Sequence, residues 1–126
     1  MLNLYQEILM DHYKNPRNRG IIAHSNFAAE QRNSSCGDEI VCTGIIDGQI
    51  LTSVHFDGKG CVISQATASL LSERIMGMAL DQILLLDKEY LLAMLGMSLG
   101  LVRIQCALLS LIALHKGIDQ YTAKNE

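Results

Sequence analysis

A thiol and a carboxylate lie two residues apart in the segment Cys36-Gly37-Asp38. In an extended backbone, side chains two positions apart leave on the same face, and Gly37 allows the chain to turn so that both point at one centre. A soft sulfur ligand beside a hard oxygen ligand suits a metal that is held and later released. Two further thiols, Cys61 and Cys106, are available to complete such a site.

Both additional cysteines are predicted to lie in the first turns of helices. Free amide groups and the positive helix end favour a thiolate there, and thiolates are what metals and persulfide chemistry need. Four sulfur ligands would hold zinc or a cluster durably, whereas Asp38 in place of one sulfur eases release and indicates transfer rather than storage. The alternative is that Cys36, Cys61 and Cys106 are ordinary small buried hydrophobic residues.

Composition narrows the class of protein. A chain of 126 residues, 49% hydrophobic and 18% charged, predicts one globular domain over residues 1–126. A net charge of −3 with scattered Lys and Arg argues against a nucleic-acid partner. The most apolar run, residues 107–114, is too short to span a membrane, and residues 1–7 lack the features of a signal peptide. We therefore expect a cytoplasmic protein.

The cysteine spacing also limits the kind of site. Cys36, Cys61 and Cys106 are separated by 25 and 45 positions, whereas zinc fingers and ferredoxins carry closely paired ligands. In a reducing cytosol, metal binding or sulfur chemistry is favoured over disulfides. Cys42 lies in the middle of a predicted strand and is interpreted as a packing residue.

The elements that must position these residues are a sheet followed by helices, which predicts an α+β fold. An apolar stripe predicts a helix over residues 2–13, and Asp47-Gly48 is typical of a two-residue hairpin turn between two strands. The predicted strands are 27–32, 39–46 and 49–56. The later predicted helices run from 61 or 62 to 76, over 80–86, over 88–95, and from 103–105 to 116.

Local signals mark the helix ends. Asp87 is predicted to cap the helix over 88–95, while Gly77, Gly96 and Gly117 are predicted stops. One side of the helix after Cys61 is predicted to face solvent, namely Ser64, Gln65, Thr67, Ser72 and Glu73.

Four segments carry a family resemblance, namely residues 11–20 (DHYKNPRNRG), 35–38 (SCGD), 56–64 (FDGKGCVIS) and 103–108 (RIQCAL). In this order they resemble the SufU/IscU/NifU-N-terminal family of iron–sulfur cluster assembly scaffolds. The resemblance implies a small α+β fold with a three-stranded antiparallel sheet, and a site formed by Cys36, Asp38, Cys61 and Cys106.

The resemblance also implies a function. Such scaffolds are not enzymes: they accept sulfur from a cysteine desulfurase, assemble a transient [2Fe-2S] cluster and pass it to apo iron–sulfur proteins. Any of the three cysteines is a candidate persulfide acceptor. Zinc often occupies the same site, so the alternative is a zinc-dependent sulfur-transfer protein in which a cysteine leaves the metal to collect persulfide. A purely structural zinc domain ranks last, because Asp38 is a poor ligand for a closed site. A monomer or weak dimer is expected.

The sequence combines features of two branches of the family, the IscU branch and the SufU branch, so the branch stays open. Gln105 stands where the IscU branch has histidine, and residues 99–103 lack the prolines of that branch's chaperone-binding segment. Arg103 and residues 11–18 resemble the SufU branch, yet the chain lacks an insertion of about 20 residues that this branch carries between its second and third cysteines. Two interpretations of Arg103 stay open: an ordinary surface residue, or a residue that offsets the charge of the site and could bond Asp38 when no metal is bound. His12 is expected to make helix-end hydrogen bonds.

Overall fold

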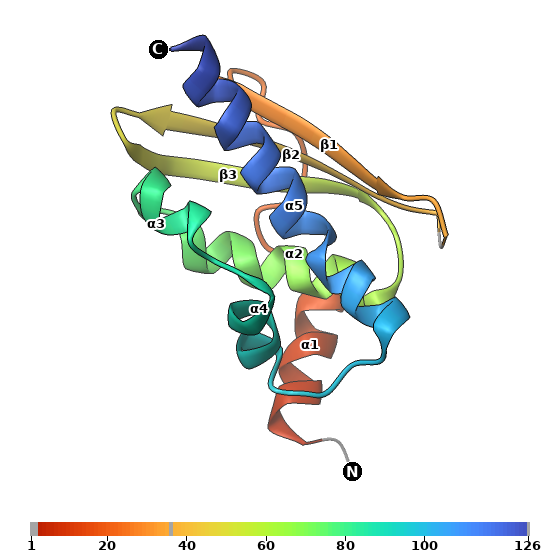
Figure 1. The fold of residues 1–126 in the computed structure, drawn as a ribbon. Coiled ribbons are helices and arrows are strands. Elements are labelled where there is room, and N and C mark those ends of the chain that lie inside the picture. The colour runs from red at the N-terminus through yellow and green to blue at the C-terminus, as the bar shows by residue number, and fades with distance from the viewer. Residues whose placement is uncertain (1–2, 36, 126) are drawn as a thin grey trace.

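A three-stranded antiparallel sheet and five helices make up the computed structural model, which describes residues 3–35 and 37–125 (Figure 1). The strands β1 (Phe27–Asn33), β2 (Asp38–Asp47) and β3 (Ile50–Lys59) lie in the order β1-β2-β3. The helices are α1 (Leu4–Lys14), α2 (Val62–Ile75), α3 (Leu80–Leu84), α4 (Lys88–Leu95) and α5 (Leu101–Lys124). The predicted α+β class with an antiparallel sheet is confirmed.

The hairpin between β2 and β3 turns at Gly48 and Gln49, because Asp47 still pairs with Ile50. Gly48 has a φ of 65°, and a positive φ at the first turn position is what a type II′ hairpin requires. The turn predicted at Asp47-Gly48 therefore lies one residue later. β3 also continues through Lys59, three residues past its predicted end, which carries the strand up to the Gly60-Cys61 pair.

Helices with strong local signals have the predicted ends. The Asp87 carboxylate accepts a hydrogen bond from Tyr90 N at 2.9 Å, and α4 ends at Gly96.

The first and third helices differ from their predicted bounds. α1 begins later than predicted, because Asn3 caps it: Asn3 Oδ1 accepts from Gln6 N at 2.9 Å, and Gln6 Oε1 accepts from Asn3 N at 3.1 Å. α3 is two residues shorter than predicted.

The predicted bounds of the last helix are wrong at both ends. α5 begins at Leu101 and runs through Gly117 to Lys124. Gly117 is buried against β1, where a Cβ would approach Phe27 Cε2 to 2.8 Å and Ala29 Cβ to 3.3 Å. The missing side chain therefore serves close packing of helix on sheet and does not end the helix.

α5 is also longer and more apolar than the short run that the sequence suggested. By length and composition alone it passes as a membrane-spanning helix, with a mean hydropathy of 1.5, but half of that window is buried inside the protein. It lies along the sheet over β1 and β2 and against α2 (Figure 1). These contacts are those of a core helix.

α2 lies between α1, α5 and β3, so its predicted solvent face is wrong at three positions. Ser64, Thr67 and Ser72 are each at most 1% exposed. The Ser72 hydroxyl donates to Ser69 O at 2.6 Å and accepts from Asn18 Nδ2 at 3.1 Å. Small hydroxyl side chains satisfy themselves on nearby carbonyls, which lets neighbouring segments approach both sides of this helix.

The outer edge of β3 is covered by two loop segments. Residues 18–20 pair beside Phe56, which donates to Asn18 O at 3.0 Å and accepts from Gly20 N at 3.2 Å. At the other end, Leu51 donates to Met78 O at 3.0 Å and accepts from Gly77 N at 2.7 Å. These pairings satisfy backbone groups that an edge strand would otherwise expose.

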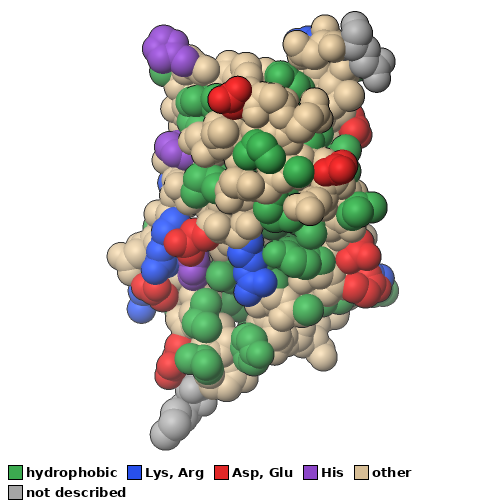
Figure 2. Space-filling model, turned by 90° about the vertical axis from the view of Figure 1, so that its left-hand side faces the viewer, with side chains coloured by type: hydrophobic (Ala, Val, Ile, Leu, Met, Phe, Trp, Pro, Cys, Tyr) green, Lys and Arg blue, Asp and Glu red, His purple; other side chains and the backbone are tan. Residues whose placement is uncertain are grey.

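The side of the molecule that carries α3 and α4 faces the viewer in Figure 2. Hydrophobic side chains lie there among polar surface, and charged side chains of both signs are spread over the view. This face shows no broad field of one sign.

Candidate metal centre

The candidate site lies at the end of the sheet where β2 begins and β3 ends. Asp38 is the first residue of β2 and pairs with Asn33 at the end of β1. Glu39 pairs with Lys59, the last residue of β3, so the chain leaves β3 directly beside Asp38 and enters α2 at Cys61. The antiparallel order of the strands therefore brings together residues more than 20 positions apart.

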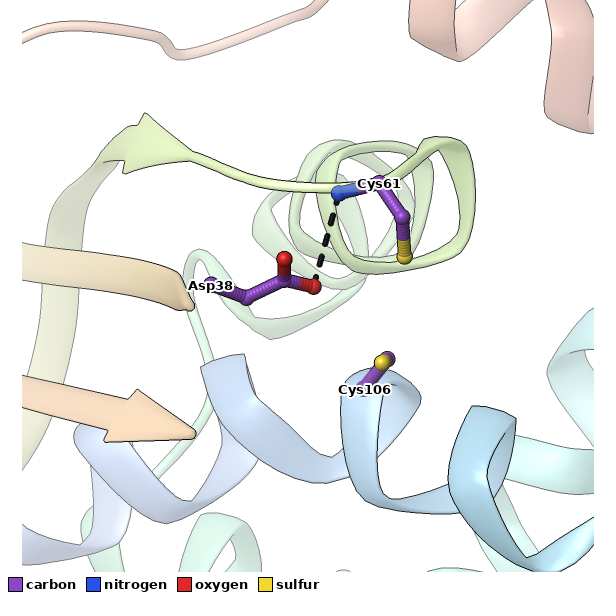
Figure 3. Close-up of side chains that lie close together, drawn as sticks. All are labelled: Asp38, Cys61 and Cys106. Carbon is purple, nitrogen blue, oxygen red and sulfur yellow. Dashed lines mark hydrogen bonds between the residues drawn. The ribbon is translucent and has the colours of Figure 1, made fainter. Parts of the chain in front are cut away.

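Asp38, Cys61 and Cys106 point toward a common centre (Figure 3). A carboxylate oxygen of Asp38 and the two Sγ atoms all lie within 4.8 Å of one another. The three side chains come from β2, from the residue that precedes α2, and from α5. Two soft ligands and one hard ligand at this spacing suit a single metal centre.

Cys61 occupies the N-terminal capping position of α2, as predicted, and its residue is exposed. Its backbone N–H donates to Asp38 Oδ2 at 3.4 Å, which joins the start of α2 to the start of β2. Its Sγ lies 3.8 Å from Ser64 Oγ.

Cys106 differs from the prediction in its place on the helix. It lies in the second turn of α5, because that helix begins at Leu101, and it is 4% exposed. The argument from free helix-end amides therefore does not apply to it. Its thiol hydrogen-bonds to Asp38.

Asp38 is 4% exposed, and opposing effects act on the pKa of its carboxyl. Burial raises this pKa, but hydrogen bonds from the Cys61 backbone N–H and from the side chains of Cys61, Ser64 and Cys106 lower it, and the net shift is downward. The carboxylate is therefore held in its ionised form, which is the form that binds a cation.

Gly60 and Ser64 complete the packing around the carboxylate. A Cβ on Gly60 would lie 2.8 Å from Asp38 Cγ and would collide with Ser64 Oγ. Ser64 is 1% exposed, and its Oγ lies 3.1 Å from Cys61 O. Ser64 was predicted on an outer face. The signal that could have indicated its role is its position three residues after Cys61, on the same side of the first helical turn.

Cys36 and Arg103 are two further predicted site residues. Cys36 lies outside the described residues, whereas Gly37 beside it has a φ of 76°, which agrees with the predicted turn. Arg103 is exposed and lies in a groove formed with residues of α1 and α2, including Met10 and Val62. The described residues show no bond between Arg103 and Asp38, and the exposed position agrees with the interpretation of Arg103 as a surface residue. Because α5 begins at Leu101, Arg103 lies inside this helix, about one turn before Cys106, and borders the same groove as residues of α1.

The remaining candidates serve packing. Cys42 is fully buried in the middle of β2, and burial raises the pKa of its thiol well above the ordinary value. His12 is 5% exposed, and its Nδ1 lies 2.7 Å from Ser69 Oγ on α2. The predicted helix-end role of His12 is therefore wrong, because this ring joins two helices. His115 Nε2 bonds Ile83 O at 2.8 Å.

A three-stranded α+β fold with thiols and a carboxylate at one end of its sheet defines a small protein suited to handling a metal or sulfur. Comparison with known proteins agrees. The model of the NifU-like N-terminal domain matches residues 4–126. The zinc-dependent sulfurtransferase SufU of Bacillus subtilis is 37% identical over 97% of this chain and 94% of its own.

Two further comparisons extend this result. The iron–sulfur cluster assembly scaffold protein IscU of Thermotoga maritima is 37% identical over 68% of this chain and 61% of its own length. A crystal structure described as a putative iron–sulfur cluster assembly scaffold protein for the SUF system, from Fervidobacterium islandicum, has a TM-score of 0.76. It is 26% identical and covers 89% of this chain and 94% of its own. The chain belongs to the NifU-like N-terminal domain family of iron–sulfur cluster assembly scaffolds.

Proposed function

We propose that this chain is a scaffold on which a [2Fe-2S] cluster is assembled and from which it is passed on, with Cys36, Asp38, Cys61 and Cys106 as ligands. The observation that carries the proposal is the meeting of Asp38, Cys61 and Cys106 within 4.8 Å from three separate elements. Within this proposal residues 1–126 act as one domain that carries its cargo and does not itself catalyse a reaction.

The distribution of exposure supports transfer. Asp38 and Cys106 are buried, whereas Cys61 is exposed, so the group has an inner side fixed by the fold and an outer side open to a partner. The hard carboxylate is the weakest ligand of the set for a soft-metal cluster. A cluster held in this way is anchored by sulfur and can be released at Asp38.

The partners follow from the chemistry of assembly. Persulfide sulfur must come from a donor, for which a cysteine desulfurase is the expected source, and an electron donor such as a thiol or a reduced ferredoxin must reduce it to sulfide. The finished cluster must go to an apo iron–sulfur protein. We place this exchange in the cytoplasm, where reducing conditions keep the thiols of Cys61 and Cys106 available.

A second candidate function is zinc-dependent sulfur transfer, favoured by the near full-length similarity to the Bacillus subtilis protein. Here zinc orders the site, and one cysteine thiolate attacks the outer sulfur of a desulfurase persulfide. A new S–S bond forms, and the desulfurase thiolate leaves. That alignment spans 139 positions, whereas 97% of this chain is about 122 residues, so about 17 positions of the alignment have no residue here.

Anaerobic reconstitution separates the two candidates. The protein is incubated with iron(II), cysteine, a cysteine desulfurase and excess thiol reductant, in metal-free and in zinc-loaded form. Cys42→Ser serves as the matched cysteine control. We expect a [2Fe-2S] absorption that moves to an apo-ferredoxin. Persulfide on the chain with zinc retained, and no cluster, would support sulfur transfer instead. If neither a cluster nor a persulfide forms, both candidate functions are overturned.

A further inference from the structure

The outer edge of β1 is open in the part of the chain that the structure describes, in contrast to the covered edge of β3. β1 pairs with β2 on one side only. On its other side, Lys116 Nζ donates a hydrogen bond to Glu30 O at 3.1 Å. An open strand edge presents backbone donors and acceptors that another strand can pair with.

The backbone groups that face this edge can be assigned. Asn33 O accepts from Gly37 N at 2.8 Å, so the carbonyl of Asn33 points toward the β1–β2 hairpin. Backbone direction alternates along an antiparallel strand, so Gln31 shares this direction, whereas Glu30 and Arg32 direct their N–H and C=O groups outward. The bond from Lys116 to Glu30 O agrees with this assignment.

The outward-facing positions carry self-complementary charges. Phe27 and Ala29 face Gly117 of α5, so Glu30 and Arg32 lie on the opposite face of the sheet, where both are exposed. If two β1 strands pair antiparallel about Gln31, each Glu30 lies directly opposite Arg32 of the second copy. This register joins residues that both direct backbone groups outward, so it allows backbone hydrogen bonds and ion pairs together.

α5 presents an apolar residue beside the same point. The helix runs antiparallel to β1: Gln105 lies with Asn33 around one hollow, and Lys116 reaches Glu30. Ile112 is one turn before Lys116 on the same helical face, which places it near the level of Gln31. Its side chain is 40% exposed. A two-fold axis through Gln31 would therefore bring Ile112 toward Ile112 of the second copy.

We propose that two copies of this chain associate through β1 and the Ile112 face of α5, forming a continuous six-stranded antiparallel sheet. The interface is isologous, with Glu30 against Arg32 at two symmetric places and Ile112 near the axis. Each candidate metal centre lies at the Asn33 end of its own β1, so the antiparallel arrangement places the two centres at opposite ends of the joined strands. Both centres stay open to partners.

The Lys116 side chain must move for this pairing, since its ammonium group donates a hydrogen bond to Glu30 O. A lysine at a strand edge normally opposes strand addition. Its side chain is exposed and flexible, so withdrawal is feasible, and Lys116→Ala should strengthen association. Lys116 thus limits the dimer to higher concentrations of the chain.

Sedimentation equilibrium of the metal-free chain tests the proposal independently of the metal centre. We expect a reversible dimer with a dissociation constant below about 1 mM. Glu30→Arg and Arg32→Glu each place like charges opposite one another twice and should weaken the dimer about tenfold. Within one copy Arg32 Nε lies 3.5 Å from Glu30 Oε1 and 3.4 Å from Glu39 Oε1. The double variant Glu30→Arg/Arg32→Glu restores the complementarity between positions 30 and 32 but not the pair with Glu39, so it should recover most of the lost affinity. Glu89→Arg, the same charge change as Glu30→Arg at an exposed position of α4, is the control for that variant.

A variant at Ile112 and the concentration dependence of the wild type complete the test of the dimer. Ile112→Glu should also abolish the dimer, with circular dichroism showing a retained fold. A chain that stays monomeric up to about 1 mM, in which Lys116 keeps the edge closed, would overturn the proposal. A dimer that is unaffected by both single reversals, or a double variant as weak as the singles, would place the interface elsewhere and overturn it as well.

Discussion

Asp38 combines two properties at the scale of a single side chain: it is nearly enclosed, and it is held ionised. Hydrogen bonds from Cys61, Ser64 and Cys106 act against the effect of burial and lower its pKa. The same oxygen atoms that accept these bonds are the ones that face the two thiols (Figure 3). A metal would therefore replace hydrogen-bond donors around a carboxylate whose position is already fixed.

Asp38→Ala should affect zinc and a cluster in opposite ways. Zinc requires four ligands, so its affinity should fall when the carboxylate is lost. A [2Fe-2S] cluster is also held by bridging sulfides and thiolates, so removal of the labile oxygen should slow its release. The measurement is the cluster half-life and the rate of transfer to apo-ferredoxin under nitrogen, compared with the wild type. Faster transfer from the variant would leave Asp38 as an ordinary ligand.

The cysteines should separate into two groups on substitution by serine. Cys36→Ser, Cys61→Ser and Cys106→Ser should each abolish stable metal binding, because a serine hydroxyl is not a usable soft-metal ligand at neutral pH. Cys42→Ser should retain the metal but lower stability by about 1 to 3 kcal/mol, since it buries a hydroxyl in the core. Metal content by plasma mass spectrometry gives the answer, and loss of metal from Cys42→Ser would show that the ligand set is wrong.

Gly60→Ala should damage the site without contact to any thiol. The added methyl group would collide with Ser64 and press on Asp38, so we expect metal affinity to fall by about tenfold or more. Gly100→Ala is the matched control, because a Cβ there meets nothing within 4 Å and the φ of −70° is ordinary. Equal zinc affinities of the two variants in a competition titration would contradict a positioning role for Gly60.

At the scale of elements, helix ends set by local signals could be predicted from the sequence, whereas helix ends set by long-range packing could not. α4 was predicted at both ends because Asp87 and Gly96 act within one turn of the chain. Gly117 carried the same apparent stop signal, yet α5 continues through it, because the contact with Phe27 and Ala29 is formed by residues about 90 positions away. A single sequence shows the glycine but not the strand that packs against it.

The same distinction applies to α2 and to the candidate site. The hydroxyl residues Thr67 and Ser72 suggested an outer face, but α1, α5 and the segment that contains Asn18 cover this helix. The gathering of Asp38 with Cys61 follows from the strand pairing and could be anticipated. The position of Cys106 in the second turn of α5 could not be anticipated. It depends on a helix start at Leu101, which the sequence does not mark by a capping side chain.

α1 and α2 are joined by a buried histidine, which predicts a pH dependence of stability. His12 contacts Ser69 Oγ at 2.7 Å, and Ser69 Oγ also accepts from Arg17 N at 2.8 Å. Burial is the main cause that lowers the His12 pKa below 6.5; the charge of Arg17 adds to it, and that of Glu73 opposes it. The unfolded chain therefore binds a proton more readily than the folded chain.

Stability should consequently be full above about pH 6.5 and should fall as the pH drops from there through the lower pKa of the folded state. Urea denaturation of the metal-free chain between about pH 8 and pH 5 measures this, and His12→Gln should be less stable at pH 8 and less dependent on pH. His24→Gln, at an exposed position, should keep the wild-type profile. An unchanged pH profile in His12→Gln would show that another group is responsible.

At the scale of the whole molecule, the candidate metal centre is placed where the sheet and two helices meet. β2 supplies Asp38, the entry to α2 supplies Cys61, and α5 supplies Cys106, while α5 also packs along β1 and β2. The ligands are brought together by long-range contacts and separate when the chain unfolds. Metal binding is therefore thermodynamically linked to folding of the entire domain.

This linkage predicts a concentration-dependent gain in stability. A metal that binds the folded chain at about 1,000 times its dissociation constant should add about 4 kcal/mol. For a chain of this size, that gain should raise the melting temperature by roughly 10 °C or more. Differential scanning calorimetry of the zinc-loaded and the chelator-treated protein measures the difference.

Cys61→Ser provides the decisive comparison for this prediction. Cys61 is exposed and caps α2 without a side-chain hydrogen bond to the helix backbone, so serine there should leave the metal-free melting temperature nearly unchanged. The rise with zinc should disappear in the variant, because one sulfur ligand is lost. If wild type and Cys61→Ser gained equally from zinc, the metal would be stabilising the chain from a site other than the one formed by Asp38, Cys61 and Cys106.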